Sequence, residues 1–374
     1  MHTRLTSPRL AGGIQAGFTL LEIMIALTIA LVLLTVLSLV FVANGSYRQD
    51  LDRSSRLVEN SSYSLQRLTD DLRLAGYYAE FDINSAGLPA PATMVVADSY
   101  ACATDLPSLR AALTMSIQGY DGGTGLPAAC TAVLTDRKTG SDVLVIRRVD
   151  TCAVGAAGCD AVVANVPYFQ ASQCTSDGTY VAPATNLPTI QFKLDTNTAN
   201  LDLRLIDCNV NGALPLAAFH RFVVDIYYVA NNDNAGDGIP TLKLAQLGAT
   251  GGATAFSVIP LAEGIENLQL EYGLDTTAAP GDGIPDVYTA DPSTYNGCAG
   301  AACVTNWINT VAVKVSMLGR NTERTAIGYV NDKSFTLGLQ ANGTANTFGP
   351  FNDRFKRHVY AASVRLYNPG GRRE

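Results

Sequence analysis

The sequence predicts an α+β protein in which a long N-terminal helix packs on a large antiparallel β-sheet body. Three observations support this. The first is an unbroken apolar run over residues 18–43, and the second is a seven-residue repeat of apolar or small residues over residues 51–75. The third is a series of short apolar or alternating stretches separated by Gly, Asn, Asp and Pro clusters. Strands that follow one another without intervening helices indicate antiparallel sheets.

The apolar run predicts a membrane-spanning helix over residues 18–43. Its length of about 26 residues exceeds the roughly 20 that a helix needs to cross a bilayer. Arg4 and Arg9 precede it, and basic residues on this flank keep the N-terminus in the cytoplasm. A cleaved secretory signal fits poorly, because the run is too long and no small-x-small site follows it. Glu22 distinguishes the run from a plain anchor, since carboxylates within spans usually mark function.

The helix is expected to continue past the membrane over residues 44–78 as an amphipathic segment. Two rows of apolar or small residues recur every seven positions: Leu51, Val58, Leu65 and Leu72, and Ser54, Ser61, Leu68 and Ala75. Ser54 and Ser61 weaken a coiled-coil seam, so the outer half is expected to pack on the body of its own chain. The whole helix is expected from about Thr19 to Ala75.

Strands are expected in eight stretches that lie after the helix: residues 143–149, 189–194, 201–206, 222–229, 268–274, 311–318, 335–340 and 359–367. The body divides in this interpretation into a disulfide-bearing insertion over residues 79–210 and a C-terminal β-rich body over residues 211–374.

The hexapeptide "GFTLLE", from Gly17 to Glu22, resembles the type IV prepilin signature. The resemblance implies that residues 1–17 are a basic leader, which the prepilin peptidase removes after Gly17. It also implies that Phe18 becomes the N-methylated first residue. Glu22, the fifth mature residue, would then pair with the terminal amine of a neighbouring subunit inside a filament.

Four C-terminal segments resemble the PilW branch of minor pilins, a branch of type IV pilin-like proteins: residues 260–275, 281–288, 307–320 and 358–374. This implies a structural subunit that helps initiate type IV pilus assembly within a low-abundance priming or tip complex. Its partners would be other minor pilins, the major pilin and the prepilin peptidase. The chain would cross the inner membrane once, with a periplasmic body, before entering the filament. A J-type minor pseudopilin of type II secretion and a pilus-borne adhesin remain alternatives.

Eight cysteines follow the span, on the side assigned to the oxidising periplasm: Cys102, Cys130, Cys152, Cys159, Cys174, Cys208, Cys298 and Cys303. An even number in such a compartment predicts disulfides, although eight cysteines allow 105 pairings. The short Gly/Ala loops between Cys152 and Cys159 and between Cys298 and Cys303 favour those two local pairs. The spacing and the scarcity of histidines disfavour zinc.

The pentapeptide "GDGIP" occurs at residues 236–240 and again at residues 281–285. Asp-Gly suits a hairpin turn. The alternative is a Ca²⁺ site, in which Asp275, Asp282 and Asp286 would supply oxygens. Apart from this possible calcium, no cofactor is expected.

Composition and motifs exclude two other classes of function. The formal net charge is −7, and no cluster of Lys and Arg follows the span, so nucleic acid is not an expected partner. The sequence has no nucleophile, metalloprotease or phosphate-loop motif, and an enzyme is therefore not expected.

Overall fold

The computed structural model describes residues 17–81, 100–172, 192–205, 216–278, 281–325 and 328–371. The chain separates into two compact units, one up to Asp52 and one from Arg53 onward. The first unit is helical over its described residues from Leu20. The second unit contains the outer part of the same helix and all of the sheets.

Helix α1 (Leu20–Leu74) begins and ends within one residue of the expected bounds. In the second unit its buried positions include Ser61, Ser64, Leu68 and Leu72, spaced three or four residues apart on one face. This confirms that the outer half packs on the body of its own chain. Val58, which belongs to the predicted stripe, is 53% exposed, so this packing does not extend along the whole stripe.

The helix ends where the chain turns into the sheet. Gly76 has φ of +71°, the left-handed conformation that commonly follows a helix C-terminus and that glycine adopts without strain. The Gly76 amide then donates to the Arg147 carbonyl at 2.9 Å. The helix end is thereby fixed to the sheet.

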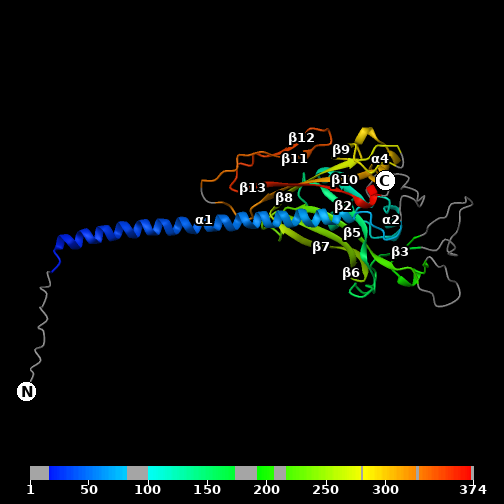
Figure 1. The fold of residues 1–374 in the computed structure, drawn as a ribbon, viewed down its shortest axis with the longest axis horizontal. Coiled ribbons are helices and arrows are strands. Elements are labelled where there is room, and N and C mark those ends of the chain that lie inside the picture. The colour runs from blue at the N-terminus through cyan, green and yellow to red at the C-terminus, as the bar shows by residue number, and fades with distance from the viewer. Residues whose placement is uncertain are drawn as a thin grey trace, which may run out of the picture. The chain divides into compact units, whose positions relative to one another are not determined.

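A seven-stranded antiparallel sheet forms the first layer of the second unit (Figure 1). Its strands are β1 (Ile117–Tyr120), β2 (Val143–Ala153), β3 (Tyr168–Ala171), β4 (Phe192–Asp195), β5 (Phe219–Ala230), β6 (Thr241–Thr250) and β7 (Ala253–Glu263). The order is β1-β2-β5-β3-β4, and β6 pairs with both β5 and β7. Strand β5 pairs with β2 along residues 220–227, with β3 along residues 219–221 and with β6 along residues 225–230.

A second antiparallel sheet has the order β13-β10-β8-β9, and a separate hairpin is formed by β11 and β12. The bounds are β8 (Ile265–Leu274), β9 (Val287–Thr289), β10 (Thr310–Arg320), β11 (Phe335–Leu339), β12 (Ala345–Phe348) and β13 (Arg357–Arg365). Short helices complete the unit: α2 (Leu106–Ala111), α3 (Cys130–Val133), α4 (Ala301–Ile308), α5 (Tyr367–Gly371), and the 3₁₀ turns η2 (Asp121–Gly123), η3 (Thr198–Asn200) and η4 (Tyr295–Gly297).

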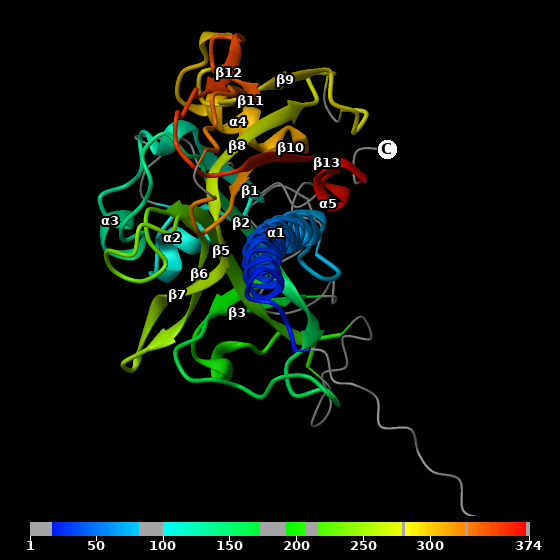
Figure 2. The ribbon, with the colours of Figure 1, turned by 90° about the vertical axis from the view of Figure 1, so that its left-hand side faces the viewer.

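The core lies on both faces of the first sheet. Successive side chains of β5 point to opposite faces and belong in turn to two different apolar clusters. Tyr227 and Val229 belong to a cluster that contains Leu68 and Leu72 of α1 together with apolar side chains of β8 and β10. Phe222 and its alternate neighbours belong to a second cluster on the opposite face. Within the second unit, Figure 2 shows β8, β10 and β13 of the second sheet above β5, β6 and β7 of the first sheet.

Most expected strands are confirmed, namely those at residues 143–149, 222–229, 268–274, 311–318, 335–340 and 359–367. The stretch at residues 189–194 overlaps β4, although residues 189–191 lie outside the described part. Strands from both sides of residue 210 share the first sheet, so this position is not a boundary between sheets. The sequence interpretation missed β6 and β7. Their turn contains Gly251 and Gly252, and β7 carries Pro260, which an edge strand tolerates.

The strand expected from Leu201 is wrong for the described residues 201–205, which form only an isolated bridge from Arg204 to Leu216. Hydrogen bonds from the Gln170 side chain explain why these residues do not pair as a strand. Its oxygen accepts from the Leu203 amide at 3.0 Å, and its nitrogen donates to the Leu203 carbonyl at 3.3 Å. A side-chain amide thus takes the place of a neighbouring strand.

A close approach of α1 to the second sheet gives a stability prediction. A Cβ at Gly319 of β10 would lie 2.3 Å from the Ser61 Oγ and 3.0 Å from the Leu57 Cδ1. Gly319→Ala should therefore lower the free energy of unfolding by about 1–3 kcal/mol, because helix and strand must separate. Denaturant unfolding of the full chain in micelles measures this change. Gly248→Ala is the control, since its Cβ would meet only the Arg221 guanidinium at 3.5 Å. Equal effects of the two changes would contradict the packing argument.

Candidate functional site

The start of α1 holds the carboxylate that the sequence singles out. The Glu22 Oε2 accepts hydrogen bonds from the Thr19 amide and hydroxyl, each at 3.0 Å. The Glu22 amide in turn donates to the Thr19 Oγ1 at 3.3 Å. This reciprocal pattern is a capping box, which satisfies amides that a helix N-terminus leaves free. Its sequence signal, Thr-x-x-Glu, lies within the hexapeptide, although no helix cap was expected there.

The first part of α1, up to Val42, is apolar and exposed on all sides in the described chain. Phe18 is 82% exposed, and the large apolar side chains up to Val42 are also exposed. Three hydroxyls, those of Thr28, Thr35 and Ser38, donate to carbonyls of the preceding turn, so they do not oppose an apolar environment. Within the described residues, α1 is long and apolar enough to cross a membrane.

All six cysteines within the described residues form disulfides. Both local pairs, Cys152–Cys159 and Cys298–Cys303, are present. The third bridge, Cys102–Cys130, spans 28 residues and is buried. Neither residue spacing nor loop composition indicated this bridge. Cys174 and Cys208 lie outside the described residues.

The two GDGIP segments lie in connections between paired strands, β5 to β6 and β8 to β9. In the second segment the Asp275 Oδ2 accepts from the amides of Asp282 and Gly283. The Asp286 carboxylate accepts from the Thr276 amide at 2.7 Å. No group of three or more His, Cys, Asp or Glu side chains arranged to hold a metal is found in the described part of the chain. Calcium binding stays a prediction, while the hydrogen bonds show what the carboxylates do within the loop.

A buried charge cluster ties α1 to the first sheet. The Arg148 Nε of β2 lies 2.7 Å from the Asp71 Oδ1 of α1, and the Arg148 guanidinium lies 3.5 Å from the Asp225 Oδ2 of β5. The Tyr227 hydroxyl donates to the Asp71 Oδ2 at 3.0 Å, and the Gln246 side chain donates to Asp225 at 2.9 Å. The sequence analysis missed this cluster. Its signal is a charged residue inside each of the apolar stretches at residues 143–149 and 222–229.

Comparison with protein families matches two parts of the chain. Residues 14–38 match the prokaryotic N-terminal methylation motif, and residues 226–368 match the type IV pilus-assembly protein W family, PilW. The C-terminal part of the chain is thus similar to the PilW family, and the two matches together support a type IV pilus minor pilin. No curated protein and no solved structure matches the chain.

The two matches bear on the start of α1. The matched pilin family is a structural one, and its members interact with other pilins and with the pilus machinery. The methylation motif covers Gly17, Phe18 and Glu22, the residues that the sequence singles out. The motif and the exposed apolar helix fit a pilin anchored in the inner membrane.

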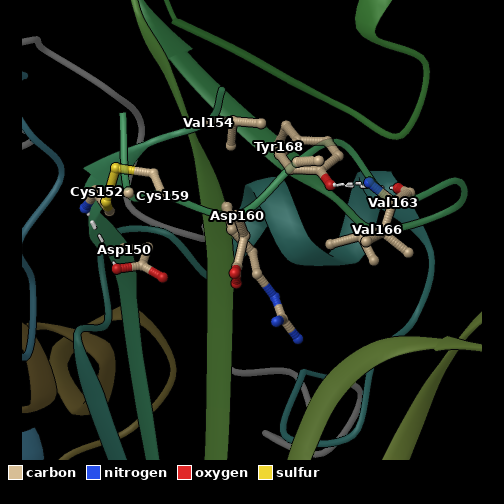
Figure 3. A pocket seen from close by; sticks show the side chains of 11 residues that line it. Asp150, Cys152, Val154, Cys159, Asp160, Val163, Val166 and Tyr168 are labelled. Atoms are coloured by element: carbon tan, nitrogen blue, oxygen red, sulfur yellow. Dashed lines mark hydrogen bonds between the residues drawn. A yellow bond between two sulfur atoms is a disulfide. The ribbon is translucent and has the colours of Figure 1, made fainter. Parts of the chain in front are cut away.

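A second feature of the chain is a cavity of about 170 Å³ beside the Cys152–Cys159 disulfide (Figure 3). The Asp150 carboxylate accepts from the Cys152 amide at 3.3 Å. On the other side, the Tyr168 hydroxyl accepts from the Val163 amide at 2.7 Å. The disulfide therefore forms part of the cavity wall.

The disulfides should contribute unequally to stability. Replacing both Cys102 and Cys130 with Ala should lower the free energy of unfolding by about 2–5 kcal/mol. The matched change at Cys152 and Cys159 should cost about 1 kcal/mol less, because its loop spans 7 residues rather than 28. Denaturant unfolding of the full chain measures both. A larger loss at the short loop would contradict the loop-length argument.

The charge cluster should make stability depend on pH. Burial and the nearby Asp71 raise the pKa of Asp225 to about 7, although Arg148 acts in the opposite direction. The folded chain therefore binds the proton of the Asp225 carboxyl group more tightly than the unfolded chain does. The stability that the protonated Asp225 contributes is present below about pH 4 and is lost as the pH rises through about 7.

Urea unfolding at a series of pH values measures this effect. The loss of stability between pH 4 and pH 7 should be smaller in Asp225→Asn than in the unaltered chain, because the variant has no proton to lose at this position. Asp202→Asn is the control, since Asp202 is an exposed carboxylate outside the cluster. Identical pH profiles for the unaltered chain and Asp225→Asn would contradict the raised pKa of Asp225 as the cause of the pH dependence.

Proposed function

We propose that this minor pilin helps initiate type IV pilus assembly as part of a low-abundance priming or tip complex. The observation that carries the proposal is the Glu22 carboxylate, which lies in the first turn of α1, where the helix up to Val42 is otherwise apolar and exposed. A charge at this position is costly in an apolar filament core unless an opposite charge meets it. Such a residue suits a subunit that associates through its helix.

The geometry at Glu22 supports a role in pairing. The hydrogen bonds that the carboxylate makes to Thr19 both go to Oε2. Among the described residues, Oε1 has no hydrogen-bond partner, so one oxygen can accept from another subunit. Cleavage after Gly17 by the prepilin peptidase, and methylation of Phe18, would leave a positively charged amine on each mature chain. The amine of a neighbouring minor or major pilin is the proposed partner of Glu22.

The size of the second unit supports a low copy number. This unit runs from Arg53 to the end of the chain, well above the common domain size of about 100–150 residues. A filament shaft made of closely packed copies would crowd bodies of this size. We therefore place few copies in each filament, near one end. The N-terminus would face the cytoplasm and the body the periplasm until the subunit leaves the inner membrane.

The proposal predicts the effect of removing the Glu22 charge without removing the helix cap. Glu22→Gln keeps a side-chain oxygen for the Thr19 amide, since glutamine also serves in capping boxes. It should nevertheless reduce co-purification with partner pilins and the number of surface pili, as should Glu22→Ala. A strain without the gene should make and process the major pilin but assemble few pili. Immunoblots of membrane and sheared fractions measure these outcomes.

Thr19→Val is the matched control, because it disturbs the cap and leaves the charge. It should retain much more partner association than Glu22→Gln. Normal pili in Glu22→Gln together with loss in Thr19→Val would assign Glu22 to helix capping alone. Normal pilus numbers in the deletion strain would refute the assembly role.

A further inference from the structure

A polar groove lies where the β11–β12 hairpin meets β8 and the η2 turn. Its volume is about 430 Å³, within the range of roughly 300–1,000 Å³ that is usual for small-molecule sites. The side chains that matter here are Asp121, Gln269, Gln340, Asn342, Asn346 and Phe348. Four of these six are amides, and one is aromatic.

The two amides at the hairpin tip have free donors. The Gln340 Oε1 accepts from the Thr344 hydroxyl at 3.3 Å, and the Asn342 Oδ1 accepts from the Thr344 amide at 2.9 Å. Both oxygens are therefore engaged within the hairpin. Neither NH₂ group has a partner among the described residues, so both remain available to a ligand.

The deeper part of the groove supplies acceptors. The Asn346 Nδ2 donates to the Gln269 Oε1 at 2.7 Å, and Gln269 in turn donates to the Gly140 carbonyl at 2.9 Å. This chain of bonds orients Asn346 and leaves its Oδ1 without a partner in the described part of the chain. The half-buried Asp121 carboxylate likewise accepts no hydrogen bond from the described residues. Burial raises its pKa, with a smaller effect from Asp291, so its charged form lacks stabilising partners.

These groups fit one class of ligand better than others. Among the described residues, no Lys, Arg or His side chain lines the groove, which disfavours phosphates and carboxylates. Aliphatic side chains are nearly absent from the lining, so an apolar peptide segment would bury little surface. Hydroxyl groups both donate and accept, which matches free amide donors placed beside free carbonyl and carboxylate acceptors. The Phe348 ring adds an apolar surface on which the C–H face of a sugar ring can pack.

We propose that this groove binds a neutral saccharide, with Gln340 and Asn342 as donors, Asn346 and Asp121 as acceptors, and Phe348 as the packing surface. The site would give the subunit a second activity besides assembly, namely attachment of the pilus to a glycan-bearing surface. The binding itself does not depend on the assembly role.

Saturation-transfer NMR on the full chain tests the proposal, in phosphocholine micelles that carry no sugar headgroup. The probes are D-glucose, D-galactose, D-mannose and N-acetyl-D-glucosamine. At least one should receive saturation from the protein. The double change Gln340→Glu and Asn342→Asp keeps the oxygens that bond Thr344 and removes both free donors. It should weaken binding by about tenfold or more, because two neutral hydrogen bonds are lost.

Thr347→Asp is the control, because it adds a carboxylate to the same hairpin at a β12 residue that does not line the groove. It should bind the probe within about twofold of the unaltered chain, a change below about 0.5 kcal/mol. The proposal is overturned if none of the four sugars receives saturation. It is also overturned if the double variant binds as well as the unaltered chain, or if Thr347→Asp loses binding equally. Circular dichroism melts of each variant separate loss of the site from loss of the fold.

Discussion

The buried contact between Asp71 and Arg148 is the constraint on which the body depends. It fixes the outer part of α1 against β2 and β5, so the helix and both sheets can share one core. Two carboxylates compete there for one guanidinium, because Asp225 also faces Arg148. Burying such a cluster adds little net stability, whereas removing one member leaves an uncompensated charge. The cluster therefore acts mainly by specifying how the helix seats on the sheet.

A second buried cluster joins the strands of the smaller sheet to the loops around it. The Arg357 guanidinium of β13 contacts the carboxylates of Glu266 and Asp353 and lies 3.7 Å from the centroid of the Phe351 ring. The Arg320 guanidinium stacks on Phe355 in the same region. These planar contacts suit arginine, which presents several donors while its face packs on an aromatic ring. They hold residues 351–357 beside β8 and β10, and this segment leads into β13.

The proposed assembly role and the proposed saccharide site use different chemistry. Pairing at Glu22 needs an apolar surrounding in which one charge selects another. The groove instead uses neutral amides and the half-buried Asp121 carboxylate, which exchange hydrogen bonds with water until a ligand replaces the water. The β11–β12 hairpin can carry such a site because it forms its own two-stranded sheet and leaves its tip exposed. Its residues can therefore change without altering the buried clusters.

The sequence by itself determined the features that depend on neighbouring residues. Apolar length predicted α1, local alternation predicted most strands, and Gly17 to Glu22 indicated the family, because these signals are local along the chain. Cysteine spacing identified two disulfides for the same reason. Tertiary structure alone decided the features that join distant residues: the Cys102–Cys130 bridge, the Asp71–Arg148–Asp225 cluster, the replacement of a strand by Gln170 and the groove beneath the hairpin. Each requires that two segments meet in space, and side-chain periodicity reports which face is buried but not which segment covers it.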